Sequence, residues 1–290
     1  MDGGAILRSL FGCYAKAEPR LRRPFVRFLS SRGSLPGLLL LAAMLLWPRS
    51  GAAAPVPVRF AEGIVRGFLV LNSSEGALLA SGDFLQVKRG AEVETRTVFY
   101  FKDGSLFDET VVFTQQPTFT MQSYRLVQKG PAFSQDMKAS LDRASGKYRV
   151  QIKDHKDGRE KVHEGKLDMP PDLYNGMVPI IAKNLRAGAG ESIHMVAFTP
   201  APRLIGLDLA PTGENKVLVG GLTKAVVHYV LKPRLSLGLK IPAALLGRLP
   251  PDNHLWIMTA EVPAFIRFEG PLYPEGPVWQ IELTSPRWVK

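Results

Sequence analysis

The sequence predicts a mainly β protein of the α+β class, in which a strongly curved antiparallel sheet, or half-barrel, wraps around one helix. Short runs rich in β-branched and aromatic residues alternate with turn signals along most of the chain. Residues 148–153 alternate between apolar and polar side chains, which is typical of a sheet with one wetted face. A single segment, 172–187, has helical spacing instead. Many strands with one interrupting helix favour a sheet that curves around that helix.

The turns are the clearest local signals. Asp103-Gly104 separates the apolar runs 95–101 and 109–114, and Asp157-Gly158 follows the alternating run, before a more polar strand that continues through Val162. Asp-Gly between such runs is a strong hairpin signal. Further strands are predicted at 64–71, 78–88, 118–128, 192–198, 203–209, 215–219, 224–232, 254–261, 264–269 and 278–284.

The helical segment follows Pro170-Pro171, with Asp172 expected as its N-cap. Pro179 within the segment predicts a kink or a late start, because proline lacks the N–H of a helix interior. Lys183 near the C-terminal end suits the helix dipole, and Gly188 is expected to end the helix. A second short helix is expected at 242–249.

Residues 1–53 have the pattern of a signal peptide with a basic leader. An apolar block, 38–47, follows a basic stretch and precedes small residues at 51–54. The block is too short for a bilayer core that needs about 20 apolar residues, but it matches the central region of a secretory signal. Cleavage is best placed before Ala54, which leaves 54–290 as a single β-rich domain. Arg22-Arg23 resembles a twin-arginine motif, so general secretion and twin-arginine export both stay open.

This leader accounts for most of the net charge of +11 and for the only cysteine. Residues 1–54 contain eight lysine and arginine residues against two acids, which leaves about +5 for the rest of the chain. Because no basic stripe or aromatic platform is visible, no nucleic-acid partner is expected. Cys13 lies in the leader, so the mature chain is expected to have no disulfide and no thiolate metal site. Contact with the membrane is expected only through the export signal.

No catalytic constellation is recognisable, and no catalytic residue, metal site or cofactor is expected. A Gly-x-Ser-x-Gly elbow and a phosphate-binding glycine loop are both missing. Asp108 and Glu109 are predicted to end a strand and cap a turn. A hydrolase site built from His194 or His228 with acids from other strands stays open as an alternative. The five histidines, none with the spacing of paired metal ligands, are His155, His163, His194, His228 and His254.

Aromatic side chains are spread over many strands, where they are expected to fill the core. A concave sheet that the helix covers only in part would also leave an apolar trough, able to hold an acyl chain or similar ligand. The candidate residues for lining such a cavity are Phe99, Phe101, Phe113, Tyr148 and Trp256.

Several short motifs resemble a group of exported bacterial proteins of unknown function. They are Ala80-Ser81-Gly82-Asp83, Phe101-Lys102-Asp103-Gly104-Ser105, Gln128-Lys129-Gly130-Pro131-Ala132-Phe133, Phe268-Glu269-Gly270-Pro271-Leu272-Tyr273 and Gly276-Pro277-Val278-Trp279. The order of parts, with Met169-Pro170-Pro171-Asp172 before the helix and Leu255-Trp256-Ile257-Met258 in a late strand, is similar to that of a broader exported domain family. The resemblance covers most of residues 60–287 and implies a half-barrel like that of periplasmic lipoprotein carriers, without catalytic residues. The stretch 233–251 departs from that arrangement.

Taken together, these patterns predict an exported, periplasmic or secreted protein without enzymatic activity, whose concave sheet binds a lipid, another apolar ligand or an envelope component. Two alternatives remain. One is the hydrolase, and the other is an envelope assembly protein that docks a partner protein through residues 233–251.

Overall fold

Fifteen strands of the described chain join in a single antiparallel sheet. The computed structural model describes residues 54–186, 188–199, 201–219, 221–234 and 251–284, and the backbone of 287–288. The predicted signal peptide and the predicted helix at 242–249 lie outside the described residues. The strands, in chain order, are β1 (Val65–Ser73), β2 (Leu78–Arg89), β3 (Glu92–Phe101), β4 (Leu106–Gln115), β5 (Phe119–Lys129), β6 (Gln135–Asp142), β7 (Lys147–Asp154), β8 (Glu160–Lys166), β9 (Glu191–Phe198), β10 (Pro202–Val219), β11 (Leu222–Arg234), β12 (Asn253–Met258), β13 (Ala264–Gly270), β14 (Trp279–Leu283) and β15 (Arg287–Trp288).

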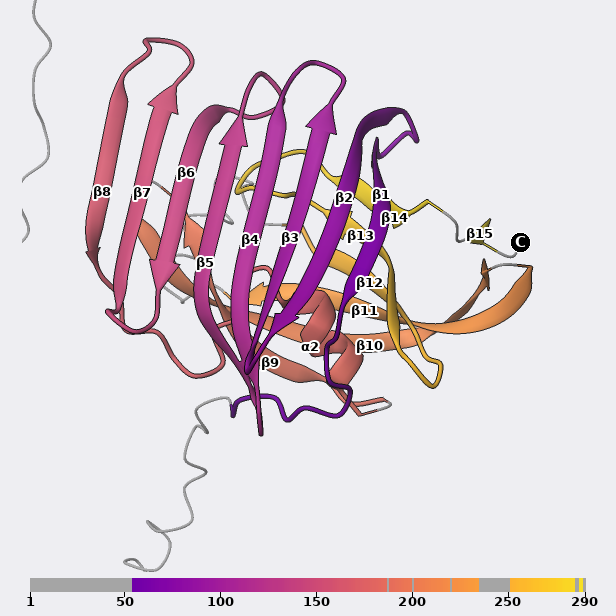
Figure 1. Ribbon diagram of the computed structural model, residues 1–290. Coiled ribbons are helices and arrows are strands. Elements are labelled where there is room, and N and C mark those ends of the chain that lie inside the picture. The colour runs from indigo at the N-terminus through magenta and orange to yellow at the C-terminus, as the bar shows by residue number, and fades with distance from the viewer. Residues whose placement is uncertain are drawn as a thin grey trace, which may run out of the picture. The chain divides into compact units, whose positions relative to one another are not determined.

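The predicted fold class is confirmed: the sheet curves into a half-barrel around one helix of the described chain. The strand order is β15-β10-β11-β12-β13-β14-β1-β2-β3-β4-β5-β6-β7-β8, and β9 pairs with β10. Figure 1 shows β1–β8 as one broad twisted layer, with β9–β13 running at an angle behind it. The pairing of β14 with β1, with Ile281 opposite Leu71, joins the two parts.

Alternation along the strands directs one face of the sheet into a common core. In β7, Val150 and Ile152 are buried while Arg149 and Lys153 point to the other face, as the period-two pattern predicts. One core cluster combines such residues from the early strands, the late strands and the helix. The face that the strands of the sheet, early and late, turn toward this cluster is called the inner face below. The opposite face is called the outer face.

The helix α2 (Val178–Asn184) is shorter than predicted, and two expectations about its ends are wrong. Asp172 is not its N-cap: Met177 holds that position without a side-chain hydrogen bond. Pro179 sets the start, because a proline fits the first turn, whose N–H groups have no partner within the helix. The late start that Pro179 predicts is therefore confirmed. The helix ends at Asn184 instead of near Gly188, since Leu185 is already extended.

Two strand expectations also differ from the structure. Residues 203–209 and 215–219 belong to one long strand, β10, which continues through a register shift between Pro211 and Gly213. Strand β6 was not expected, although Met137, Ala139 and Leu141 alternate as buried residues along it. Aspartate, lysine, alanine and methionine are weak strand formers, so packing decides the conformation of this segment.

Residues 54–64 form an N-terminal strap that ties α2 to the sheet. The Tyr174 hydroxyl accepts a hydrogen bond from the Val56 N–H (2.9 Å) and donates one to the Phe119 carbonyl (3.1 Å). The Asn184 side-chain oxygen accepts from the N–H groups of Arg59 (2.8 Å) and Phe60 (2.7 Å). The strap is thus hydrogen-bonded to Tyr174, which precedes α2, and to Asn184, the last residue of α2.

Glu62, at the end of the strap, is buried inside a polar network. Its Oε1 lies 2.6 Å from Lys183 Nζ, and its Oε2 accepts from Gln86 Nε2 at 2.9 Å. The Gln115 side chain pairs with the backbone of Glu62 in both directions, at 2.6 and 2.9 Å. A buried charge needs such partners, because an unpaired one costs several kcal/mol.

Four aromatic rings hold the opposite end of the half-barrel. Phe101, Phe133, Tyr273 and Trp279 pack with ring centroids 5.4 to 6.1 Å apart. The Tyr273 hydroxyl also donates to the Ala132 carbonyl at 3.3 Å. Two turns far apart in sequence, β5–β6 and β13–β14, are joined by this contact.

We expect Glu62→Ala to lower the free energy of unfolding by about 1–3 kcal/mol, because the partly buried Lys183 and the buried Gln86 would lose their partner. Asp108→Ala, which removes the more exposed Arg96–Asp108 pair, is the matched control and should cost about 1 kcal/mol or less. Urea denaturation of the three proteins measures both values. Equal costs for the two variants would contradict the role given to the strap.

Candidate ligand site on the inner face

The five predicted cavity-lining residues do not form one group. Phe99, Phe101 and Phe113 are buried in the main core, and Tyr148 packs against it while partly accessible. Trp256 lies on the opposite face of β12, in a second cluster around Val217, Val226 and Ile266.

Other apolar side chains of the inner face are only partly buried. Leu283 and Phe84 both lie over Gly67, where a Cβ would be 3.4 Å from Leu283 Cδ2 and 3.9 Å from Phe84 Cβ. Phe265 and Phe268 are likewise partly buried and pack against the main core. Here the inner face keeps apolar surface that the core does not cover completely.

A row of paired residues leads from this apolar region to an acidic side chain. Gly67 pairs with Phe84, Phe84 with Thr97, and Thr97 with Glu109. Directly paired residues lie on the same face of a sheet, so Glu109 shares the inner face with Phe84, two strands or about 10 Å away. The prediction that Glu109 ends a strand is wrong, because it lies inside β4 between the buried residues Phe107 and Val111.

Glu109 forms a hydrogen-bonded pair with Tyr124. The Tyr124 hydroxyl donates to Glu109 Oε1 at 2.7 Å, and its ring stacks on Phe198 with centroids 5.6 Å apart. Burial raises the pKa of Glu109, and the Tyr124 hydrogen bond offsets only part of that effect. Burial, and after it the charge of Glu109, raises the pKa of Tyr124 well above 10. The pKa of each group is therefore shifted toward its protonated form.

The segment before α2 brings backbone against this pair. It runs beside β9, where Asn175 exchanges hydrogen bonds with the backbone of Val196 at 2.8 and 2.9 Å. Gly176 follows with φ of +68°, and a Cβ there would lie 2.5 Å from Val111 Cγ2 and 3.1 Å from Glu109 Cδ. Only glycine allows the chain to pass this close to the carboxyl group in that conformation.

His194, one candidate for a hydrolase, pairs with a buried acid. Its Nδ1 lies 2.7 Å from Asp172 Oδ2, and the N–H of His194 donates to the Asp172 carbonyl at 3.0 Å. Ser192, two residues earlier on β9, donates its hydroxyl to Asp208 at 2.6 Å. The His194–Asp172 pair therefore joins the segment 170–177 to β9. Ser192 is hydrogen-bonded to a different acid, Asp208.

His228, the other candidate, lies on the outer face of β11. Its neighbours are Thr212, His254 and Trp256. A depression of about 360 Å³ opens there, lined by Asn215, His228, Trp256 and Arg267. A second one, of about 550 Å³, lies over β6–β8 and contains no histidine in its lining.

The described residues contain neither a group of metal-binding side chains nor a membrane-spanning helix. No three histidine, cysteine, aspartate or glutamate side chains in this part of the chain are grouped to hold a metal ion. None of its helices is long and apolar enough to cross a membrane.

The residues around Glu109 could have been found in part from the sequence. Phe107, Glu109, Val111 and Phe113 alternate along β4, so an acid stands in the apolar register of a strand. That pattern indicates a buried carboxyl group. Tyr124, Phe84 and Gly176 carry no comparable signal, since only the folded sheet brings them near Glu109.

Comparison with known proteins finds a weak structural similarity and no family match. No protein-family model matches the sequence, and no curated protein matches it significantly. Among solved structures, the chain is similar to a β-barrel-like protein of a domain of unknown function, DUF1849, from Brucella abortus. The identity is 10%, the TM-score is 0.42, and the match covers 82% of this chain and 100% of that chain. At this level the similarity carries no argument about function.

We expect Gly176→Ala to destabilise the protein more than Gly158→Ala. Both glycines have positive φ (68° and 67°), so each substitution costs about 1–2 kcal/mol for the left-handed conformation. Gly158 has open space around it, whereas Gly176 faces Val111 and Glu109, which adds about 1–3 kcal/mol. Equilibrium unfolding in urea measures the difference between the variants, and a difference near zero would contradict the close approach.

Glu109→Gln should stabilise the protein increasingly as the pH rises above 4.5, the ordinary glutamate value. In that range the unfolded wild type loses the proton of Glu109 while the folded protein keeps it, so wild-type stability falls relative to the variant. The difference grows by up to about 1.4 kcal/mol per pH unit and levels off above the raised pKa of Glu109.

Urea unfolding of wild type and Glu109→Gln at a series of pH values tests this dependence. Glu75→Gln, on an exposed turn, controls for the loss of one carboxyl group and should show no such slope. A pH-independent difference between Glu109→Gln and wild type would show that folding does not raise the pKa of Glu109.

Proposed function

We propose that this protein is an exported binding protein without enzymatic activity, which holds an apolar ligand on the inner face of its half-barrel. One observation carries the proposal: partly accessible apolar side chains share the inner face with the partly buried carboxyl group of Glu109, which is hydrogen-bonded to Tyr124 and whose pKa is raised by burial. Apolar surface with a few fixed polar groups is the usual composition of a small-molecule site.

The two parts of this surface suit two parts of one ligand. Phe84, Leu283, Phe265 and Phe268 offer contacts to a hydrocarbon chain, at about 25 cal/mol for each Å² removed from water. The carboxyl group of Glu109 and the hydroxyl of Tyr124 offer hydrogen bonds to an uncharged polar end. The role proposed for Glu109 is therefore to orient a ligand through a hydrogen bond.

Export is proposed from the sequence. The basic stretch, the apolar block at 38–47 and the small residues at 51–54 are typical of a secretory signal. The mature chain would then work in the periplasm or outside the cell, where a carrier shields an apolar ligand from water. A lipid or another component of the cell envelope fits this setting.

Two measurements on the wild-type protein test the proposal. Mass spectrometry of an organic extract of the purified protein should show a co-purifying apolar molecule, and the delipidated protein should enhance the fluorescence of parinaric acid, an apolar probe. A clean extract together with no probe binding would overturn the proposal.

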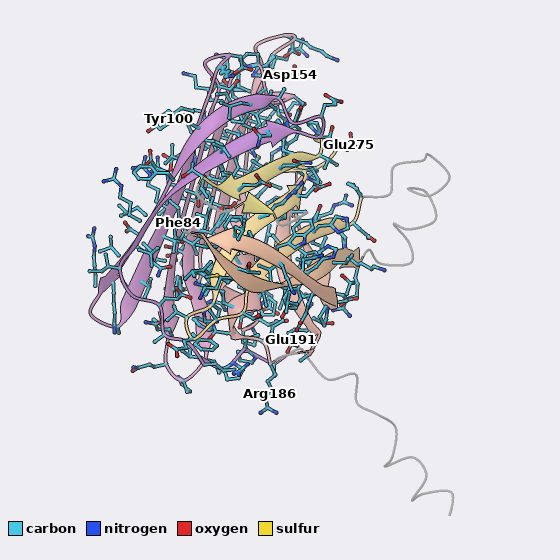
Figure 2. The ribbon with its side chains drawn as sticks, turned by 90° about the vertical axis from the view of Figure 1, so that its right-hand side faces the viewer. Phe84, Tyr100, Asp154, Arg186, Glu191 and Glu275 are labelled. Carbon is cyan, nitrogen blue, oxygen red and sulfur yellow. The ribbon has the colours of Figure 1, made fainter. Side chains whose placement is uncertain are left out.

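Phe84→Asp should weaken probe binding by at least tenfold, because it places a charge on the inner face. Tyr100→Asp, on the outer face of the neighbouring strand β3, is the matched control and should change the affinity less than twofold. Figure 2 labels both positions. Circular dichroism checks that each variant is folded, and equal affinities would place the probe elsewhere on the molecule.

A further inference from the structure

Two histidines face each other across strands on the outer face of the late half of the sheet. His228 on β11 pairs with Trp256, and Val230 pairs with His254 on β12, so the two histidines are diagonal neighbours. His228 Nε2 lies 3.0 Å from His254 Nδ1. These nitrogens come from strands joined by a long connection, so only the sheet register brings them together.

The surroundings hold the His228 ring in place. Trp256 stacks on it with centroids 4.5 Å apart and an angle of 7° between the planes. The Thr212 hydroxyl lies 2.9 Å from His228 Nδ1, on the side of the ring away from His254. With the proton on Nδ1, His228 donates to Thr212 and presents the lone pair of Nε2 toward His254. A partner on the far nitrogen is the usual support of a metal-binding imidazole.

The same place on the surface is open to a small ligand. The depression of about 360 Å³ reaches the His228 ring, and both histidines are only partly buried. Glu269 is the direct cross-strand neighbour of His254. Arg267 brings a positive charge, but it forms ion pairs with Glu269 (3.1 Å) and Glu282 (3.3 Å), which offset that charge.

We propose that His228 and His254 together bind one divalent transition-metal ion, with Cu²⁺ preferred. Nitrogen ligands about 2.0–2.1 Å from a metal lie about 2.9 Å apart in adjacent square-planar positions and about 3.3 Å apart in a tetrahedron. The observed 3.0 Å lies in the range that two nitrogen ligands of one shared ion require. Among the described residues, no third histidine, cysteine or carboxylate is grouped with this pair, so water would complete the coordination.

Binding needs only a local rearrangement. The ion replaces the hydrogen bond between the two rings, and each imidazole stays neutral with its proton on the nitrogen away from the metal. Cu²⁺ leads the Irving–Williams order, so we expect it to bind more tightly than Zn²⁺.

The test uses protein purified without a polyhistidine tag. Isothermal titration with Cu²⁺ should give one site per chain, and its affinity should fall at least tenfold in both His228→Gln and His254→Gln. His163→Gln, on the edge strand β8, is the control and should bind as the wild type does. Unchanged binding in the His228 and His254 variants would overturn the proposal.

A second measurement does not depend on the folding of any variant. Electron paramagnetic resonance of the wild-type protein with one equivalent of Cu²⁺ should show coupling to two imidazole nitrogens. A spectrum with one nitrogen or none would also overturn the proposal. Quenching of tryptophan fluorescence at the same stoichiometry is expected as well, because Trp256 stacks on His228.

Discussion

The ion pair between the buried Glu62 and the partly buried Lys183 is the contact on which the arrangement of the inner face depends. Lys183 belongs to the last turn of α2, and Glu62 reaches it from the strap while binding Gln86 on β2 and Gln115 on β4. These bonds fix the helix against the early strands. The segment before the helix is fixed with it, and that segment places Gly176 beside Glu109. The geometry around the carboxyl group therefore originates in a polar network distant from it in sequence.

The inner and outer faces of the sheet hold two different kinds of polar group. On the inner face, burial favours the neutral form of Glu109, and its partner is a phenol. On the outer face, His228 and His254 meet beside an open depression, with carboxylates nearby. Low polarity around the first group suits an uncharged ligand, whereas the accessible nitrogens of the second suit a cation. The two sites can therefore be tested independently.

The fold could be predicted from local signals, because glycine turns and two-residue alternation report directly on backbone conformation. The start of α2 was harder to predict from the sequence. Asp172 has the residue type of an N-cap, but its carboxylate pairs with His194 on β9. Strand β6 was missed because its residues form strands only when their neighbours cover Met137 and Leu141. The candidate site was the least predictable part. Aromatic content indicated apolar surface, yet only the sheet register shows that Phe84, and not Phe99, keeps part of its surface accessible.

The pairing of β14 with β1 has a consequence for how the chain reaches this state. Leu283 lies opposite Leu69, so two strands near opposite ends of the domain must meet before the middle of the sheet is complete. Contacts between residues so distant in sequence slow folding, because closing the long loop between them lowers the conformational entropy of the chain before the stabilising contact forms. A chain that emerges from a ribosome or a membrane channel with its N-terminal end first therefore holds β1 with one open edge until nearly the whole domain has been delivered. The final pairing in this part of the sheet therefore forms only after β14 has been made, and until then one edge of β1 is open.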